Sequence, residues 1–449
     1  MADPADSTDA PTEPGAASTS VAAPDELETV DDAALTLAAP EVLADSLQEY
    51  LRAWLVRIRS GGSGALPIIA GLIALVIFFQ IEQSSFLTSG NIVNLLEQAA
   101  EYILFGVAEL FALLLSEIDL SVGYTAAVGA FIIAELIAAP VNLPWWVAIL
   151  AMLLAMGAFG ALQGTLITRL GLPSFVVTLG GLLFMNGVML ELANVDKTAV
   201  GGVIQIDPNS PVAKLVNANM SPALSWIALV VGLAAFAALS LSRASRRRSQ
   251  GLSAPPIGIT LLTIAATAIG GIAVVYVCNL NRGALAPLKG VPWVVPFVIL
   301  VLIGVTWLLG RTRLGRYIYA IGANPEGARR AGINVARIRT AGFALCAMTA
   351  GLAGLAYESR LGSMSTSVQG GNLVLYAVAA AVIGGASLFG GRGKPLHALL
   401  GGIIIATVFN GLGLMGVSDA VQFISTAIVL ILAVTLDAVV RRRAATGAT

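Results

Sequence analysis

Long apolar stretches recur along the whole chain and constrain its fold more than any other feature. Each has about the 20 residues that a helix needs to cross the hydrocarbon core of a bilayer. The composition agrees, since 57% of the residues are hydrophobic and only 11% are charged, about half the charge of a soluble protein. We therefore predict an all-α polytopic membrane protein with 10–12 transmembrane helices. About twelve spans are expected, at 65–81, 92–115, 122–139, 145–168, 173–193, 222–242, 257–278, 293–310, 338–357, 372–389, 396–414 and 420–440.

Two glycine-rich segments, 117–123 and 384–394, interrupt this apolar pattern. Non-helical backbone is tolerated inside a bilayer only where protein covers it, because its polar groups need partners. We therefore expect some helices to be broken or re-entrant at these points. In the first segment, Asp119 or Ser121 is expected to cap the helix that follows. Direct contact with a solute is the alternative role for these side chains.

The basic residues indicate how the chain is oriented. Twenty of the 25 Lys and Arg residues fall on one side of the membrane when the N-terminus is placed inside. Positive charge concentrates in cytoplasmic loops, so both termini are predicted to be cytoplasmic. The same assignment predicts an extracytoplasmic loop at 194–221 and basic cytoplasmic loops at 243–256 and 311–337. It leaves no Lys or Arg for the spans themselves.

The N-terminal segment differs in composition from the rest. Twelve of the 26 acidic residues lie in the first 49 positions, and no basic residue precedes Arg52. Such a segment, rich also in Ala, Pro, Ser and Thr, buries too little apolar surface to order itself. We predict a disordered acidic cytoplasmic tail over 1–50, followed by a transmembrane domain over 51–443.

Four glutamates fall inside the apolar stretches, where charged groups are costly. They are Glu97, Glu101, Glu109 and Glu135, and the first three share a helical face. With no cation expected inside the spans, these groups either line a wet pathway or are held protonated by burial. The alternative for Glu97 and Glu101 is that their carboxylates reach water at the outer interface.

Several classes of function are excluded by what the chain lacks. The single histidine, His397, rules out a histidine-based metal cluster. A phosphate loop would need Gly at 388 and Ser or Thr at 395, where Leu388 and Pro395 stand. The net charge of −1 gives no basis for nucleic-acid binding. We predict neither an enzyme nor a cofactor bound by this chain.

The loop 311–337 contains signals for a short helix. Asn324 is a good N-cap, Pro325 suits the first helical position, Glu326 lies in the first turn and Gly332 suits the end. A helix of about ten residues, 324–333, is therefore expected parallel to the membrane. It either rests on lipid head groups or docks a cytoplasmic partner.

Four motifs in order along the chain resemble the membrane permeases of sugar-importing ABC transporters, of the ribose/xylose/arabinose group. The resemblance spans roughly residues 65–440, and NRGALAPLKGVP at 281–292 is most like the xylose-type branch. The motifs are EIDLSVG at 117–123, PSFVVTLGG at 173–181, TRLGRYIYAIGANPEGARRAGINV at 312–335, and AAAVIGGASLFGGRG at 379–393, followed by Asn410 and Gly411.

The resemblance implies a permease subunit of an importer in the bacterial cytoplasmic membrane. A monosaccharide, a pentose such as xylose, would be delivered by an extracytoplasmic sugar-binding protein. A cytoplasmic, duplicated ATPase would use ATP and dock on the helix 324–333, and a second permease subunit would complete a homodimer. The coupling residues implied are Asn324, Pro325, Glu326, Ala328, Arg329, Gly332 and Ile333, and the helix-break motif contains Glu117, Asp119, Ser121 and Gly123.

The chain departs from the family pattern at three places, one of which is Ala323, where the family usually has Gly. Ser116 stands where the family usually has Gly, and Ala108-Glu109 stand where it usually has Gly-Met. Candidate pathway residues are Glu109, Thr178, Asn186 and Asn410. Two alternatives remain: a related permease for nucleosides or branched-chain amino acids, and a proton-coupled secondary transporter that uses the glutamates.

Overall fold

The computed structural model describes residues 66–195, 202–252, 256–283, 286–368, 370–418, 420–428, 431 and 435. The predicted acidic tail, 1–50, lies outside the described residues. The chain divides into two compact units. Within the described residues, one unit contains only the end of one long helix and the start of the next, over 239–262, and the other contains everything discussed below.

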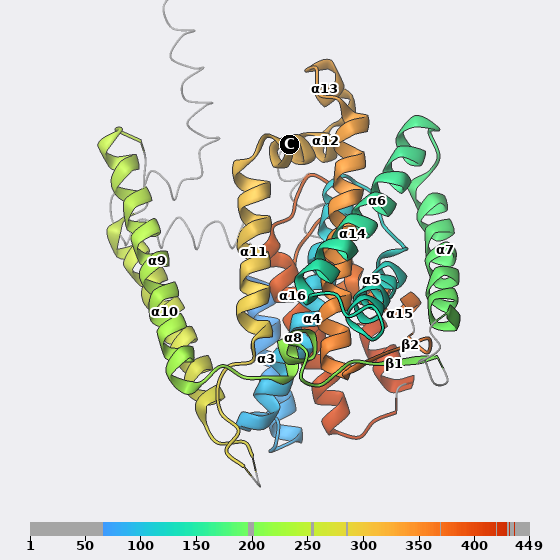
Figure 1. Ribbon diagram of the computed structural model, residues 1–449. Helices are drawn as coiled ribbons and strands as arrows, with labels where there is room; N and C mark the ends of the chain where they lie inside the picture. The colour runs from blue at the N-terminus through green and yellow to red at the C-terminus, as the bar shows by residue number, and fades with distance from the viewer. Residues whose placement is uncertain are drawn as a thin grey trace, which may run out of the picture. The chain divides into compact units, whose positions relative to one another are not determined.

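The described chain is built almost entirely of helices (Figure 1). Its helices are α3 (Leu66–Glu82), α4 (Ser89–Leu114), α5 (Val122–Ile137), α6 (Trp145–Arg169), α7 (Ser174–Val195), α8 (Pro211–Asn217), α9 (Pro222–Ser249), α10 (Ile257–Asn279), α11 (Val294–Arg311), α12 (Arg313–Ala323), α13 (Pro325–Arg330), α14 (Val335–Leu361), α15 (Gly370–Ile383) and α16 (Pro395–Leu414). A two-stranded antiparallel sheet pairs β1 (Val203–Gln205) with β2 (Ser363–Ser365).

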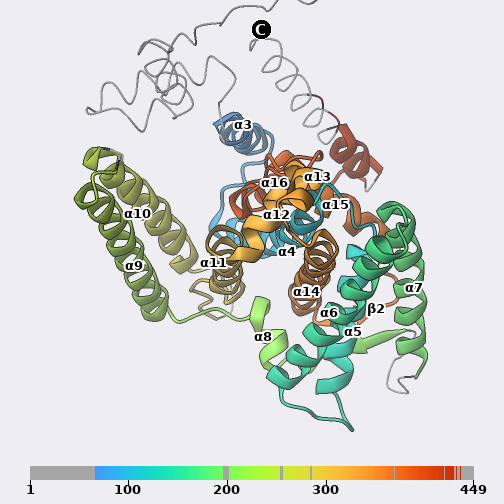
Figure 2. The same ribbon diagram turned by 90° about the horizontal axis from the view of Figure 1, so that it is seen from above.

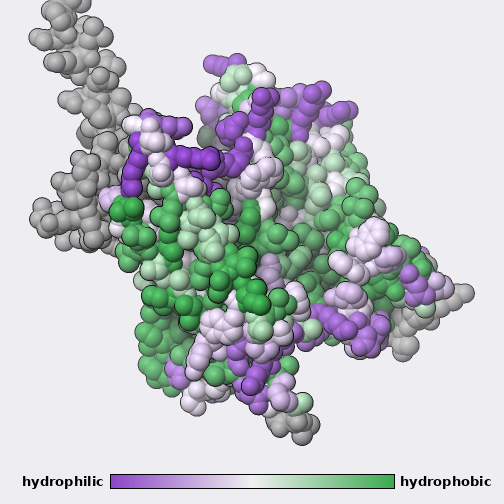
Figure 3. All heavy atoms as spheres, turned by 60° about the vertical axis from the view of Figure 1, so that its left-hand side comes forward, coloured by the Kyte–Doolittle hydropathy of each residue, from purple (hydrophilic) through white to green (hydrophobic). Residues whose placement is uncertain are grey.

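Eleven of the twelve predicted spans correspond to one of these helices, nine of them to within four residues at each end. Helix α9 continues seven residues past its predicted span, and α15 ends six residues before the end of its own. Among the described residues, seven helices are long and apolar enough to cross a membrane, and α3, α5 and α15 are shorter apolar helices. Figure 3 shows a broad band of apolar side chains with hydrophilic residues at its edges. A mostly helical fold, with several helices long and apolar enough to cross a membrane, is confirmed. Twelve spans and cytoplasmic termini stay predictions.

Helix α4 lies at the centre of the core. From Ala99 to Leu115 all but one of its residues are buried, and it packs against α11, α14, α15 and α16 (Figure 2). Helix α14 packs in turn against α4, α5 and α6. Because lipid is as apolar as a leucine side chain, this association depends on close packing rather than on removal of apolar surface from water.

Small residues allow α14 to approach its neighbours closely. A Cβ atom at Gly354 of α14 would lie 2.0 Å from the backbone oxygen of Ala126 in α5. One at Gly160 of α6 would lie 2.3 Å from the backbone oxygen of Phe343 in α14. Both contacts involve backbone, which cannot rotate away, so these positions require glycine.

Both predicted breaks are present. The chain is non-helical between α4 and α5 and between α15 and α16. The predicted cap on α5 is wrong for Ser121, whose side chain makes no capping bond. Instead, Asp119 Oδ1 accepts hydrogen bonds from the Ser121 backbone N–H at 2.9 Å and the Ser121 hydroxyl at 2.6 Å. This Asx-type turn arises because a short carboxylate reaches the backbone two residues on.

We expect Gly354→Ala to destabilise the folded protein by about 1–3 kcal/mol, because the added methyl group forces α14 away from α5. Thermal unfolding of the detergent-solubilised chain measures the effect. Gly187→Ala in α7 is the matched control, since a Cβ there meets nothing within 4 Å. Equal unfolding temperatures for the two variants would contradict the close-packing argument.

Candidate functional site

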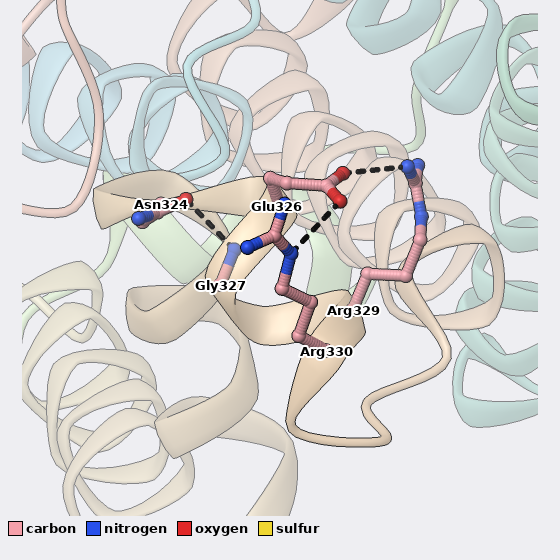
Figure 4. Close-up of polar contacts among 5 residues, drawn as sticks. All are labelled: Asn324, Glu326, Gly327, Arg329 and Arg330. Carbon is pink, nitrogen blue, oxygen red and sulfur yellow. Dashed lines mark hydrogen bonds and ion pairs between the residues drawn. The ribbon is translucent and has the colours of Figure 1, made fainter. Parts of the chain in front are cut away.

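Helix α13 is a short, capped helix at the surface (Figure 4). The Asn324 side chain accepts a hydrogen bond from the Gly327 N–H at 2.8 Å, and Pro325 occupies the first helical position. At the other end, Gly332 takes a left-handed φ of +81°, and the Ile333 N–H donates to the Ala328 oxygen at 3.0 Å. The predicted cap and stop are confirmed, but the helix spans six residues rather than about ten.

The charged side chains of α13 point outward. Glu326 forms ion pairs with Arg329 at 3.0 Å and Arg330 at 3.4 Å (Figure 4), and all three side chains are more than half exposed. Exposed ion pairs contribute little stability, so the Asn324 cap does more to hold the helix. Ala328 alone is buried. The helix therefore exposes its charged side chains and packs against the rest of the protein through the apolar Ala328.

Helix α12, which precedes α13, was not predicted. Its N-cap is Thr312, whose hydroxyl accepts a hydrogen bond from the Gly315 N–H at 3.1 Å. It buries Ile318 and Ile321 and leaves Arg316 exposed. The signals were present in the sequence: a threonine cap followed by apolar residues three and four apart.

Ser116, directly after α4, connects three parts of the chain. It has a left-handed φ of +64°, which is unusual for a residue other than glycine. Its hydroxyl lies 3.1 Å from the backbone oxygen of Gly322 in α12 and 3.1 Å from that of Phe389, between α15 and α16. We call Ser116, Gly322 and Phe389 the three-way junction.

Further contacts reinforce the three-way junction. The Gly391 N–H donates to the Leu114 oxygen at the end of α4, at 3.0 Å. The Tyr319 hydroxyl of α12 donates to the Gly393 oxygen at 2.6 Å, and burial raises the pKa of this phenol, which keeps it a donor. A Cβ at Gly322 would lie 1.8 Å from the Leu114 oxygen. Helix α12 is therefore held tightly against both breaks.

The residues of the first break occupy different environments. Glu117 forms an ion pair with Arg339 of α14 at 3.3 Å, with both side chains largely buried. Gly123 allows close approach, because a Cβ there would lie 1.9 Å from the Gly370 oxygen at the start of α15. Thr178 of α7 donates to the Ile118 oxygen at 3.3 Å. The break thus contacts α7, α14 and α15.

A fully buried polar cluster lies behind the break. The Asp119 N–H donates to Glu109 Oε1 at 3.3 Å, and the Cys346 thiol lies 3.5 Å from Asp119 Oδ2. The Gln163 amide donates to the Ser121 hydroxyl at 3.0 Å. Sequence reasoning selected Glu109, Asp119 and Ser121 but missed Gln163 and Cys346, which come from distant helices. Glu109 Oε2 has no hydrogen-bond partner within the described residues.

The other two candidate pathway residues lie elsewhere. Asn410 of α16 is buried and accepts a hydrogen bond from the Asn91 amide of α4 at 2.7 Å. Asn186 of α7 is half-buried and makes no hydrogen bond within the described residues. Only Glu109 and Thr178 among the four candidates lie beside the first break.

The expectation that no cation is available to pair with these glutamates is wrong for Glu101. Arg360 of α14 pairs with Glu101 of α4, its Nη1 atom lying 3.4 Å from Glu101 Oε1. Glu101 is only 2% exposed, so its carboxylate does not reach open water, whereas Glu97 is half-buried. The error came from ending the predicted span at 357. Helix α14 continues to Leu361, where Gly362 takes a left-handed φ of +68°.

The fold and these sites define a polytopic membrane protein with a capped surface helix fixed to two helix breaks. Residues 91–434 match the family "Branched-chain amino acid transport system / permease component". The chain belongs to this family of transport permeases. No solved structure matches it.

Curated relatives cover most of the chain. It is 34% identical to the xylose transport system permease protein XylH of Escherichia coli (strain K12), over 84% of this chain and 92% of that protein. It is 30% identical to the D-allose transport system permease protein AlsC of the same strain, over 84% and 92%. It is 28% identical to the ribose import permease protein RbsC, over 86% and 95%. The resemblance to sugar permeases, and the prediction of a transport subunit rather than an enzyme, are confirmed.

The three-way junction yields a test with two substitutions at one position. Ser116→Ala removes the hydroxyl contacts and keeps the left-handed φ, and we expect a loss of about 1 kcal/mol in the free energy of unfolding. Ser116→Gly also removes the hydroxyl but relieves the backbone, which recovers about 1 kcal/mol. Thermal unfolding in detergent measures both. If Ser116→Gly is the less stable variant, backbone strain at this position is not significant.

Proposed function

We propose that this chain is the permease subunit of an ATP-driven importer and forms the translocation pathway for a monosaccharide. The similar xylose, ribose and allose transport proteins support a sugar as the solute, and the xylose protein has the highest identity of the three. A pentose such as xylose is therefore the proposed substrate. An extracytoplasmic binding protein delivers it, and the chain acts in the bacterial cytoplasmic membrane.

The observation that carries the proposal is the attachment of α12 and α13 to both helix breaks. A docking element can drive transport only if its position differs between the states of the pathway. The contacts of Ser116, Gly322 and Tyr319 connect α12 to the end of α4 and to the segment before α16. A movement of α13 and α12 would therefore act directly on two core helices, α4 and α16.

We propose that a cytoplasmic ATPase docks on α13, and that ATP is bound and hydrolysed there rather than by this chain. The exposed Arg329 and Gly332 form the contact surface with the half-buried Ile333, while Asn324 and Ala328 hold the helix in shape. Two permease subunits pair to form the pathway, which opens to each side of the membrane in turn.

A second solute class follows from the family description, which names branched-chain amino acids. A proton-coupled secondary transporter is the weaker alternative, since it has no need of a docking helix.

Uptake into proteoliposomes containing the chain, its ATPase and its binding protein distinguishes these three hypotheses. Labelled xylose, ribose and leucine are compared under ATP alone and under a proton gradient alone. Pentose uptake with ATP alone supports the proposal, and uptake by the lone chain under a gradient contradicts it.

We expect Arg329→Ala and Gly332→Ala to reduce ATP-driven uptake at least tenfold while membrane insertion stays normal. Loss of Arg329 removes a charged contact, and a side chain at Gly332 strains its left-handed φ of +81°. Lys289→Ala is the control, since Lys289 is exposed and lies in a segment expected outside. Normal uptake in both α13 variants would exclude docking at this helix.

A further inference from the structure

The outer half of α4 carries a stripe of polar side chains. They are Asn91, Asn94, Glu97, Gln98 and Glu101. At 100° per residue these five positions fall within an arc of about 120° of the helix. The first four are half-buried and Glu101 is buried, so the stripe faces protein or water rather than lipid. A polar stripe of this kind is typical of a helix that lines a pathway.

The stripe ends at the ion pair between Glu101 and Arg360. Glu101 lies twelve residues from the start of α4, about 18 Å along the helix at 1.5 Å per residue. The pair is therefore remote from both ends of α4. Replacing a buried ion pair by apolar residues is often neutral for stability. A contribution to stability therefore does not by itself explain why Glu101 and Arg360 are present. On α14, Arg360 lies one residue before the end of the helix at Leu361, so the pair connects the middle of α4 to the end of α14.

Arg360 keeps most of its hydrogen-bonding capacity unused. Its side chain is 28% exposed, and within the described residues its one hydrogen bond is to Glu101. A guanidinium has five N–H donors. Arg282 shows the contrast, because it donates to the Cys278 oxygen, to Asn219 Oδ1 at 3.1 Å and to the Gly290 oxygen at 3.2 Å. Arg282 is held as a structural residue, whereas Arg360 has donors left for a ligand.

Three aromatic rings lie next to this pair. Tyr102 follows Glu101 directly, and its ring centroid lies 5.7 Å from that of Tyr376 in α15 and 5.8 Å from that of Phe409 in α16. The rings of Tyr376 and Phe409 are 4.8 Å apart. Tyr102 and Phe409 are half-buried, so part of each remains accessible. Rings of this kind supply flat apolar surface with specific geometry.

We propose that Glu101, Tyr102, Arg360, Tyr376 and Phe409 form a monosaccharide-binding subsite on the pathway, here called the α4 subsite. The inference rests on the proposed function. A sugar has a rim of hydroxyl groups and C–H faces that pack against aromatic rings. The planar Arg360 fork donates hydrogen bonds to two neighbouring hydroxyl oxygens, Glu101 accepts a hydrogen bond from a sugar hydroxyl, and the rings contact a C–H face.

A structural role for the pair makes different predictions from a role in recognition. Arg360→Lys keeps the charge and the ion pair but loses the planar fork. The double variant Glu101→Arg with Arg360→Glu restores an ion pair with reversed positions. If the pair is only structural, both variants transport normally. If it binds sugar, both lose uptake.

The experiment measures initial rates of ATP-driven pentose uptake in proteoliposomes with both partners, over a range of sugar-loaded binding protein. We expect Arg360→Lys, Arg360→Gln and the double variant to lose at least tenfold in uptake rate, the effect of losing hydrogen bonds to a charged group. Thermal unfolding in detergent checks that each is folded. Wild-type uptake in Arg360→Lys or in the double variant would overturn the α4 subsite. If Arg360→Gln does not fold, Arg360→Lys carries the test, since it preserves the pair.

A second pair of variants tests the aromatic part of the α4 subsite. Phe409→Leu should lower the uptake rate and change the ratio of xylose to ribose uptake, because the stacking surface is reduced. Phe236→Leu, on α9 and 37% exposed, is the matched control and should change neither. Equal xylose-to-ribose ratios for the two variants would overturn the aromatic contact. Absence of any monosaccharide uptake by the wild-type chain would instead overturn the proposed function, and the α4 subsite with it.

Discussion

The end of α4 sets the constraint on which the rest of the structure depends. Backbone polar groups at the end of a helix need partners wherever protein buries them, as it does at Leu114. Here the Leu114 oxygen accepts from the Gly391 N–H, and the Ser116 hydroxyl reaches the oxygens of Gly322 and Phe389. The break after α4 is therefore stabilised by the segment before α16 and by α12. The contacts that make the break tolerable also fasten the surface helices to the core.

The glutamates of α4 show how similar residues acquire different roles from their neighbours. Glu101 is paired with Arg360, while Glu109 is fully buried beside the Asp119 backbone. Glu97 stays half-buried on the polar stripe. A proton-coupled mechanism that treats all three alike has less support once Glu101 has a fixed cation. The polar stripe and the buried cluster are separate features, at different depths along one helix.

Hydropathy and local signals predicted much of this architecture. Span positions follow from the length of apolar runs, and α13 followed from Asn324, Pro325 and Gly332, which act within a few residues of themselves. The partners of Glu101, Asp119 and Ser116 could not be predicted in this way. Each lies far away in sequence, and which helices meet depends on glycine contacts such as Gly354 with Ala126 that have no periodic signature. The left-handed φ of Ser116 could not be predicted either. The hydrogen bonds that offset its backbone strain are made to α12 and to the segment before α16, which are far away in sequence.

Helix α4 joins the two ends of the proposed mechanism. One end lies at the three-way junction, next to α12 and α13, and the other half carries the polar stripe and the α4 subsite. Helix α4 has 26 residues and is therefore about 39 Å long. In the proposed mechanism, a displacement at Ser116 would be transmitted along this helix to Glu101 and Tyr102. Because Arg360 belongs to α14, which is not part of the three-way junction, such a displacement would change the distance between Arg360 and Glu101. In the proposed mechanism, binding of the sugar and docking of the ATPase would be coupled through α4, which is the condition for one to influence the other.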